Sequence, residues 1–300
     1  MNEGVIQVNG FGDPIGAHRG ISRTNGRSPN FTAIANKTYF GYIPDVRIPL
    51  TAVKKFIIRM QGNVEGITYT VTLEGDTLKA NEDGTYTGSY GSYAVKATKQ
   101  GYKCWRGTFS ITEANEGDQL CIVDMVETGE NGWDGITLTE AEFADGIYQI
   151  ATGSQLAWFA NEVNSGKYTI SGALTNDIDL CHFDWTPIGG TKSNTSFQGQ
   201  FYGQGHTVAG LYINNPSGTY QALFGYVKDS EISGIIVVGE VSAKQYAAGV
   251  VAYLGVHSYV DRCANHANIT NTSTYTGGIT GSASQSTCTV TNCYNTGAIS

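Results

Sequence analysis

The sequence has few charged residues, and positive charge is especially scarce. Of its 300 residues 15% are charged, with 18 Lys and Arg against 26 Asp and Glu, so the formal net charge is −8 at pH 7. Binding to a phosphate backbone depends on clustered Lys and Arg. We therefore expect no nucleic-acid partner for this chain.

Long apolar runs are also missing. No segment approaches the roughly 20 apolar residues that a membrane-spanning helix needs, so we expect no membrane insertion within this sequence. The first residues, MNEGVIQVNG, lack the basic and then apolar order of a secretory signal. The chain is either cytosolic or a piece of a longer exported protein. We favour the exported piece because the sequence stops within a repeated pattern.

Several catalytic and metal-binding motifs do not occur. The histidines stand apart from one another, so the H-E-x-x-H pattern of zinc peptidases is missing, as are a G-x-S-x-G elbow and a glycine-rich phosphate loop. The closest cysteine pair, Cys288 and Cys293, has no neighbouring His and no zinc or redox spacing. We expect no cofactor. A disulfide between Cys104 and Cys121 and a pair of buried, reduced thiols both fit the sequence.

Glycine and tyrosine, with counts of 39 and 18, are abundant instead, and helix formers are scarce. This composition is typical of an all-β protein rich in turns, and the length suggests two or three domains. We divide the chain into an irregular or β segment without an assigned role (1–62), a β-sandwich (63–127), a polar, Gly-rich linker (128–135) and a repeat region (136–300).

The sandwich is predicted from alternation along the chain. Ile67, Tyr69, Val71 and Leu73 share one face of a strand, and threonines share the other. Further short strands follow between turn signals. The stretch ATKQGY, residues 97–102, resembles PEGA-like and carboxypeptidase-regulatory-like sandwich modules, and that resemblance implies a spacer or binding unit outside the cell.

A single short helix is predicted at residues 153–165. Thr152 and Gln155 form a T-x-x-Q capping box, and Leu156, Phe159 and Val163 fall on one apolar stripe. Gly166 follows, in the usual place for a helix stop. The stripe must be buried, so we expect this helix to cap the repeats that follow it.

The repeat region contains three superposable segments: EISGIIVVGEVS (231–242), YVDRCANHANIT (259–270) and TVTNCYNTGAIS (289–300). They place Ile235, Cys263 and Cys293 at one position, with separations of 28 and 30 residues. Strand-forming repeats of this length indicate a parallel β-helix in which each coil lies about 4.8 Å above the last.

Equivalent side chains should then form vertical columns. We expect Val260 to lie between Ile232 and Val290, and Ile269 between Val241 and Ile299. The two cysteines should fill a small apolar slot beneath Asn265 and Asn295, whose amides should hydrogen-bond between coils.

The repeats resemble the GLUG-repeat family. GITG (278–281) matches its core motif with Gly278 and Gly281. GVVA, which starts at Gly249, lacks the last glycine, and LFG (223–225) is a shortened form. NCYNTG (292–297) matches the companion motif of the family. The resemblance covers about residues 133–300. It implies a right-handed parallel β-helix in exported bacterial proteins, such as adhesin-like surface proteins and the non-catalytic part of IgA-cleaving metallopeptidases. More repeats or a cap should then follow Ser300.

Two kinds of residue are candidates for a functional site. Asp177 and Asp179 point outward on one predicted strand, with Asp184 and His206 expected nearby. They could serve a polysaccharide lyase or hydrolase or bind calcium, but the favoured interpretation is that they end strands and shape turns. No Lys or Arg stands beside these residues in the sequence.

Tyrosines recur throughout the repeats and suit a sugar ring or an apolar partner. From nine of them we select Tyr202, Tyr212 and Tyr253 as candidate binding residues. The nine are Tyr202, Tyr212, Tyr220, Tyr226, Tyr246, Tyr253, Tyr259, Tyr275 and Tyr294.

These observations favour a non-enzymatic, monomeric segment of an extracellular bacterial surface protein. Its β-helix would act as a stalk or recognise a glycan or a host surface protein. The alternatives are an enzyme acting on polysaccharide and an accessory region of a larger secreted metallopeptidase.

Overall fold

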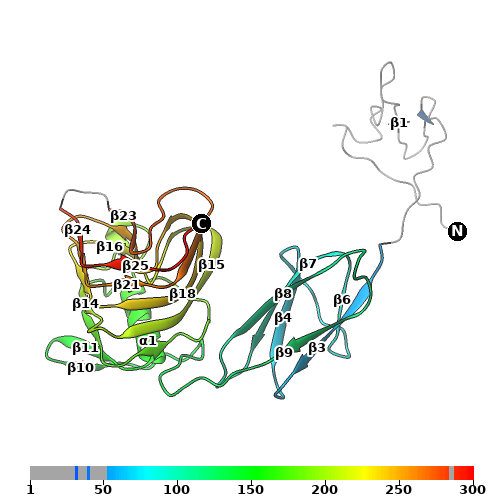
Figure 1. Cartoon of the computed structure of the whole chain (residues 1–300), viewed down its shortest axis with the longest axis horizontal. Coiled ribbons are helices and arrows are strands. Elements are labelled where there is room, and N and C mark those ends of the chain that lie inside the picture. Colours follow the sequence, from blue (N-terminus) through cyan, green and yellow to red (C-terminus); the bar gives the residue numbers. More distant parts are fainter. Residues whose placement is uncertain (1–30, 33–38, 41–52, 284–286) are drawn as a thin grey trace. The chain divides into compact units, whose positions relative to one another are not determined.

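The structure is a computed structural model that describes residues 53–283 and 287–300, together with the strands β1 (Phe31–Thr32) and β2 (Tyr39–Phe40) (Figure 1). The chain forms two compact units, Met1–Val53 and Lys54–Ser300. In the first unit, β1 and β2 pair antiparallel. The rest of the segment predicted as irregular, up to residue 52, lies outside the described residues.

The second unit begins with two small sheets that form the predicted sandwich. One sheet has the order β6-β3-β9 and the other β5-β4-β7-β8. The alternation on the longest strand explains the packing, because Tyr93, Val95 and Ala97 are buried while the residues between them are not. The strands are β3 (Phe56–Gly62), β4 (Thr68–Leu73), β5 (Asp76–Thr77), β6 (Tyr86–Gly88), β7 (Gly91–Thr98), β8 (Trp105–Ile111) and β9 (Gln119–Val123).

Two of our domain boundaries differ from the structure. Strand β3 lies within the segment that we had left unassigned, yet it pairs with both β6 and β9 and buries Phe56 and Ile58. The sandwich therefore starts by Phe56 and not at residue 63. The predicted linker is also partly structural, because Trp133 is 8% exposed and packs edge-on against Trp185 at 5.8 Å.

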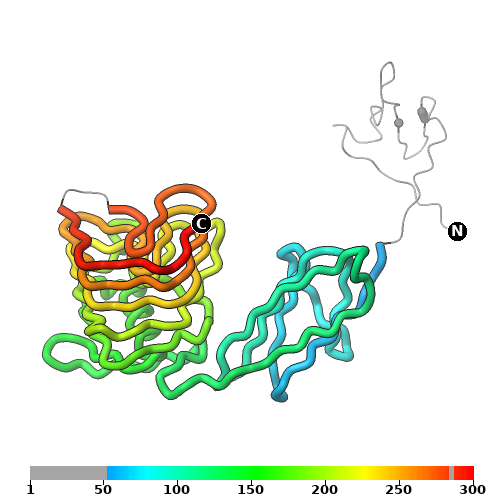
Figure 2. Tube along the Cα trace, in the orientation of Figure 1, coloured from blue at the N-terminus to red at the C-terminus, as the bar shows by residue number. Residues whose placement is uncertain are grey.

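A β-solenoid of about four turns follows. Its coils lie above one another in sequence order, from green to red in Figure 2. Three sheets make its walls. The first has the order β10-β11-β12-β14-β17-β20-β24, the second β13-β15-β18-β21-β25 with β22 also paired to β18, and the third β16-β19-β23. All pairs except β10–β11 are parallel. The all-β fold with a parallel solenoid is confirmed.

The solenoid strands have the following bounds. They are β10 (Glu142–Ala144), β11 (Ile147–Ile150), β12 (Gly172–Leu174), β13 (Ile178–Asp179), β14 (Gln200–Tyr202), β15 (Thr207–Gln221), β16 (Phe224–Val227), β17 (Glu231–Ser233), β18 (Ile236–Ala247), β19 (Val251–Leu254), β20 (Tyr259–Asp261), β21 (Ala264–Asn265), β22 (Asn268–Asn271), β23 (Thr280–Ala283), β24 (Thr289–Thr291) and β25 (Tyr294–Asn295).

Helix α1 (Gly153–Asn164) ends within one residue of its predicted range. The Thr152 side chain accepts a hydrogen bond from the Gln155 N–H at 3.3 Å, and the Gln155 side chain accepts one from the Ala151 N–H at 2.8 Å. The apolar stripe packs into the solenoid core, where Phe159 meets Phe201 at 5.5 Å between ring centroids. The helix thus covers apolar residues of the solenoid's first coils, as a cap should.

The predicted columns are present. Val260 is in register with Ile232 and Val290, and Ile269 is in register with Val241 and bridges to Ile299. In the cysteine column the Ala264 N–H donates to the Ile235 carbonyl and the Tyr294 N–H to the Cys263 carbonyl. All six cysteines are free thiols, so Cys104 and Cys121 are not bridged.

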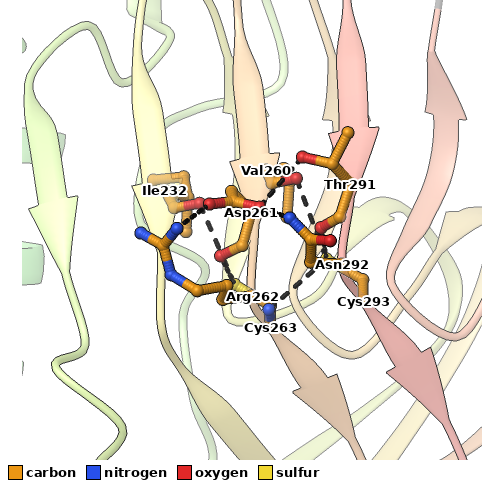
Figure 3. A network of polar contacts seen from close by, with 8 residues as sticks. All are labelled: Ile232, Val260, Asp261, Arg262, Cys263, Thr291, Asn292 and Cys293. Carbon is orange, nitrogen blue, oxygen red and sulfur yellow. Dashed lines mark hydrogen bonds and ion pairs between the residues drawn. The ribbon is translucent and has the colours of Figure 1, made fainter.

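The residues directly before Cys263 and Cys293 form a polar corner of the solenoid (Figure 3). The Asp261 carboxylate accepts hydrogen bonds from Thr291 Oγ1 at 2.9 Å and Asn292 Nδ2 at 2.8 Å, which lower its pKa. Arg262 and Asn292 both have positive φ, 51° and 52°. A tight corner therefore stands before Cys263 and before Cys293 and turns the chain into the next sheet.

The two repeat motifs depend on each other through one contact. A Cβ atom on Gly249 would collide with the side chain of Asn265, and one on Gly278 would collide with that of Asn295. Asn265 is fully buried, and its Nδ2 donates to Asn295 Oδ1 at 2.6 Å and to the Ala267 carbonyl at 3.0 Å. The first glycine of each of these motifs, Gly249 or Gly278, thus clears the space for an asparagine of the companion motif.

Replacing Asn265 with Ala should lower the free energy of unfolding by about 1–3 kcal/mol, because the buried Ala267 N–H and carbonyl would lose their partner. Urea denaturation followed by circular dichroism measures the change. Asn295→Ala is the matched control, since Asn295 is exposed and should cost less. Equal losses in both variants would contradict the role of burial.

Candidate functional site

Three tyrosines of successive coils stack into a ladder beside the third sheet. The rings of Tyr220 and Tyr246 lie 4.6 Å apart at 13°, and those of Tyr246 and Tyr275 lie 4.7 Å apart at 4°. All three have positive φ, between 55° and 67°, which glycine or asparagine would adopt at lower cost. Strained backbone at three equivalent places is a reason to look for a function here.

Two further tyrosines complete the group. Tyr226 and Tyr253 are in register, with ring centroids 4.5 Å apart, and the edge of Tyr253 meets Tyr246 at 5.5 Å. We call these five residues the tyrosine cluster. Four are half-buried, and Tyr220 and Tyr246 among them pack against a cluster of small alanines. Tyr275 is 52% exposed. The cluster is therefore both a structural contact and an accessible aromatic surface.

A groove of about 720 Å³ adjoins Tyr220, the first ring of the ladder. We call it the Tyr220 groove. One wall is the middle and end of β15, and the other is the segment that follows β13. Its lining consists of Asn164, Asp184, Trp185, Thr186, Pro187, Gly189, Gly190, Thr191, Lys192, Thr195, Tyr212, Ile213, Asn214, Asn215, Tyr220 and Gln221.

Several hydrogen bonds fix the walls of this groove. Asn164, at the end of α1, donates to the Pro187 carbonyl at 3.0 Å and accepts from the Gly189 N–H at 2.9 Å. The Trp185 backbone N–H donates to the Tyr212 carbonyl at 2.9 Å, and its indole donates to the Leu223 carbonyl at 3.2 Å. These contacts use the Asn164 side chain and the Trp185 indole, and they do not involve the exposed side chains of Thr186, Thr191 and Asn214.

The lining combines an aromatic ring with hydroxyl and amide groups. Thr186, Thr191 and Asn214 are exposed, and Tyr220 is half-buried. Charge is sparse, with Lys192 on one side and Asp184 on the other, and Asp184 is paired with Lys96 and Arg106 of the sandwich. A concave surface with aromatic rings and a few polar groups is the usual form of a small-molecule site.

The three tyrosines that we selected lie on three different sheets. Tyr212, on β15, lines the groove but has the Arg106 guanidinium 3.8 Å from its ring centre. Tyr253, on β19, belongs to the tyrosine cluster, and Tyr202, on β14, lies on the first sheet. They do not form one binding surface.

The ladder could have been found from the repeat. Tyr220, Tyr246 and Tyr275 each stand three residues before the first residue of a repeat element, namely Leu223, Gly249 and Gly278. The repeat elements given above begin after these tyrosines and so do not include them. The groove could not have been found in this way, because it lies where the first coils depart from the repeat.

The acidic candidates are held by separate partners. Asp177 accepts from the Thr207 N–H at 2.8 Å and lies 3.3 Å from His206 Nδ1, as expected of its neighbour. Asp179 contacts Lys103 Nζ at 2.6 Å. No basic residue stands beside Asp179 in the sequence, and the fold brings Lys103 to it from the sandwich.

Burial tends to raise the pKa of Asp179, but the hydrogen bonds from Lys103 and the Cys181 N–H lower it overall. The pKa of Asp177 is also lowered, chiefly by the Thr207 N–H. Both groups are thus stabilised as carboxylates by protein contacts. Among residues 53–283 and 287–300, no three His, Cys, Asp or Glu side chains gather as a metal site would require.

Asp179→Asn should lower the free energy of unfolding at pH 7 by about 1 kcal/mol, because it removes a half-exposed ion pair. The pKa of Asp179 is lower in the folded state than its unfolded value of about 3.8. The ion pair therefore stabilises the fold at pH values above about 3.8, and this stabilisation is lost as the pH falls through the folded-state pKa. The difference from wild type should therefore vanish in acid. A difference that is constant from pH 7 to pH 2 would contradict this assignment.

Burial, and then the neighbouring tyrosines, raise the pKa of Tyr220 and Tyr226 above the usual value of 10. Raised pKa values stabilise the fold fully below about pH 10, and this stabilisation is lost as pH rises through the folded values. Tyr220→Phe should make the fall in unfolding free energy above pH 10 less steep. Urea titrations across this range measure the slope, and an unchanged slope would refute the prediction.

Comparison with known proteins gives little further information. No protein-family model and no solved structure matches the chain. A curated protein from Evansella cellulosilytica named "Putative Gly-rich membrane protein" is 27% identical over 119 residues, which cover 37% of this chain and 13% of that protein. The chain thus spans a small part of that protein's length. Within the described residues, no helix is both long and apolar enough to cross a membrane.

Proposed function

We propose that the solenoid is a recognition segment of a bacterial surface or secreted protein and that the Tyr220 groove binds a carbohydrate chain. The observation that carries this proposal is the position of Tyr220. Tyr246 stacks on one face of its ring, small alanines pack against it, and Tyr220 also lines the groove. An aromatic ring can pack on the C–H face of a sugar while nearby hydroxyl and amide groups bond the sugar hydroxyls.

The charge of the chain favours a neutral ligand. A net charge of −8 opposes the approach of a polyanion. Within the groove, Asp184 is already paired with Lys96 and Arg106, and Lys192 is the other charged residue of the lining. We therefore expect neutral or N-acetylated sugars, such as cellulose or chitin fragments, to bind better than polyuronates.

The family resemblance supports the same setting. Gly249 and Gly278 of the GLUG-type motif and Asn265 and Asn295 of the companion motif meet in the core, which is a reason for the two motifs to occur together. In this proposal the solenoid belongs to the GLUG-repeat group of exported proteins and the sandwich is a spacer. Labelling of intact cells with an antibody against the solenoid tests the surface location, and signal obtained only after lysis would count against it.

Tyr220→Asn should weaken binding of neutral hexasaccharides about tenfold or more, because it removes the aromatic platform. Isothermal titration calorimetry with cellohexaose, chitohexaose and hexagalacturonate measures the loss. Asparagine tolerates the positive φ of this position. Tyr275→Asn is the matched control, since it makes the same change at the opposite end of the ladder, outside the groove.

The proposal predicts wild-type affinity for Tyr275→Asn. If both variants lose affinity equally, the ladder acts only through stability. If none of the three sugars binds the wild-type protein, carbohydrate recognition by this groove is refuted.

A further inference from the structure

A second hollow, of about 730 Å³, surrounds Tyr202 on the outer face of the first parallel sheet. We call it the Tyr202 hollow. It shares no residue with the Tyr220 groove. Its lining consists of Asp145, Ile147, Gln149, Ala173, Tyr202, Gln204, Gly205, Ser233, Gly234 and Arg262.

The register of the sheet explains why Tyr202 stands in a depression. In its outward column the neighbours are Ala173 on one side and Ser233 on the other. Both are small and low in exposure, 3% and 5%, so they form a floor. Tyr202 is therefore not enclosed between two aromatic neighbours of its own column, unlike Tyr246 in the ladder.

The adjacent corner column opens the same depression. Tyr202, Ser233 and Asp261 are in register with one another on successive coils. The residues that follow them, Gly203, Gly234 and Arg262 respectively, form the corner column. Two successive corners therefore carry no side chain, whereas the following coils carry Arg262 and Asn292. Of these two glycines only Gly234 lines the hollow, so the small side chains of Ala173 and Ser233 and the missing side chain of Gly234 leave the space beside the Tyr202 ring.

Polar groups of several kinds surround this ring. Gln149 and Gln204 supply amides, and Asp145 supplies a carboxylate. Arg262 is 66% exposed in its side chain and is oriented by an ion pair with Asp261 at 2.5 Å. Amide, carboxylate and guanidinium groups around one half-buried aromatic ring suit a ligand that has an apolar face and a rim of hydroxyls.

We propose that the Tyr202 hollow is a second saccharide-binding site, which takes one pyranose ring against Tyr202. This inference rests on the proposed function for its class of ligand. The residues, the sheet and the cavity are different from those of the Tyr220 groove. Two sites on different faces would let one protein hold two glycan chains, and binding to a surface rich in glycan would then be strengthened by multivalency.

Two variants test the hollow in opposite ways. Tyr202→Ala removes the ring. Gly234→Asn fills the space. Asparagine can adopt the backbone conformation of Gly234, which has φ 67°, because Asn292 occupies the same column with φ 52°. A Cβ at Gly234 would lie 3.2 Å from the Gln204 backbone nitrogen and 3.3 Å from that of Gly205, so this backbone must move by a few tenths of an ångström. Circular dichroism and thermal melting confirm that each variant is folded.

The probes are cellotriose and chitotriose, titrated into the whole chain by calorimetry. Wild-type protein should show two classes of site. Tyr202→Ala and Gly234→Asn should each weaken one class about tenfold, which corresponds to roughly 1.4 kcal/mol. Tyr220→Asn should weaken only the other class. Tyr259→Ala is the matched control, because Tyr259 is 49% exposed on the same sheet but does not line the hollow.

The outcomes separate this inference from the proposed function. Loss of affinity only in Tyr220→Asn would overturn the second site and leave the groove. Loss only in Tyr202→Ala and Gly234→Asn would support the second site and overturn the groove. If Tyr259→Ala behaves like Tyr202→Ala, or if neither sugar binds wild-type protein, the inference is wrong.

Discussion

The structure depends on the register between successive coils. Parallel strands stack at a fixed spacing, so each side chain must match the residue one repeat before it and the residue one repeat after it. The column of Ile232, Val260 and Val290 shows the apolar form of this constraint, and the bond from Asn265 to Asn295 shows the polar form. A shift by one residue would turn the apolar column to solvent and remove the buried amide bond together.

The same register produces both proposed sites. Where large residues recur in one column, as Tyr220, Tyr246 and Tyr275 do, their rings stack, and Tyr220 at one end of the ladder lines the groove. Where small residues interrupt a column, as Ala173 and Ser233 do around Tyr202, a hollow results. Binding surfaces on such a fold are therefore set by which residues repeat and which do not.

Much of the fold could be predicted because repetition is visible in one dimension. Cys263 and Cys293 fixed the alignment of coils, and the capping signals around Thr152 fixed the helix. The contact of Lys103 with Asp179 could not be predicted, since it joins residues 76 apart that belong to different domains. The sequence alone also places Phe56–Gly62 outside the sandwich. This strand pairs with β6 and β9, which come later in the chain, and no turn signal in the sequence connects it to either of them.

The candidate sites were harder to predict than the fold. Tyrosine content pointed to aromatic surfaces, but the sequence does not say which face a tyrosine shares with which polar neighbour. Tyr212 illustrates the difficulty, because its ring is occupied by Arg106 from the sandwich. The Tyr220 groove also depends on the irregular segment around Trp185 and Pro187, where the repeat gives no alignment.

The pairing of Gly249 with Asn265 and of Gly278 with Asn295 has a consequence for how such a chain can change in evolution. Each of these two coils carries both halves of this fit, so duplication or loss of such a coil as a whole keeps each of these glycines facing an asparagine. An insertion of any other length would separate them and place a side chain against backbone. Growth in whole units lets the height of the solenoid vary freely while its cross-section stays constant, and the number of aromatic rungs would scale with that height.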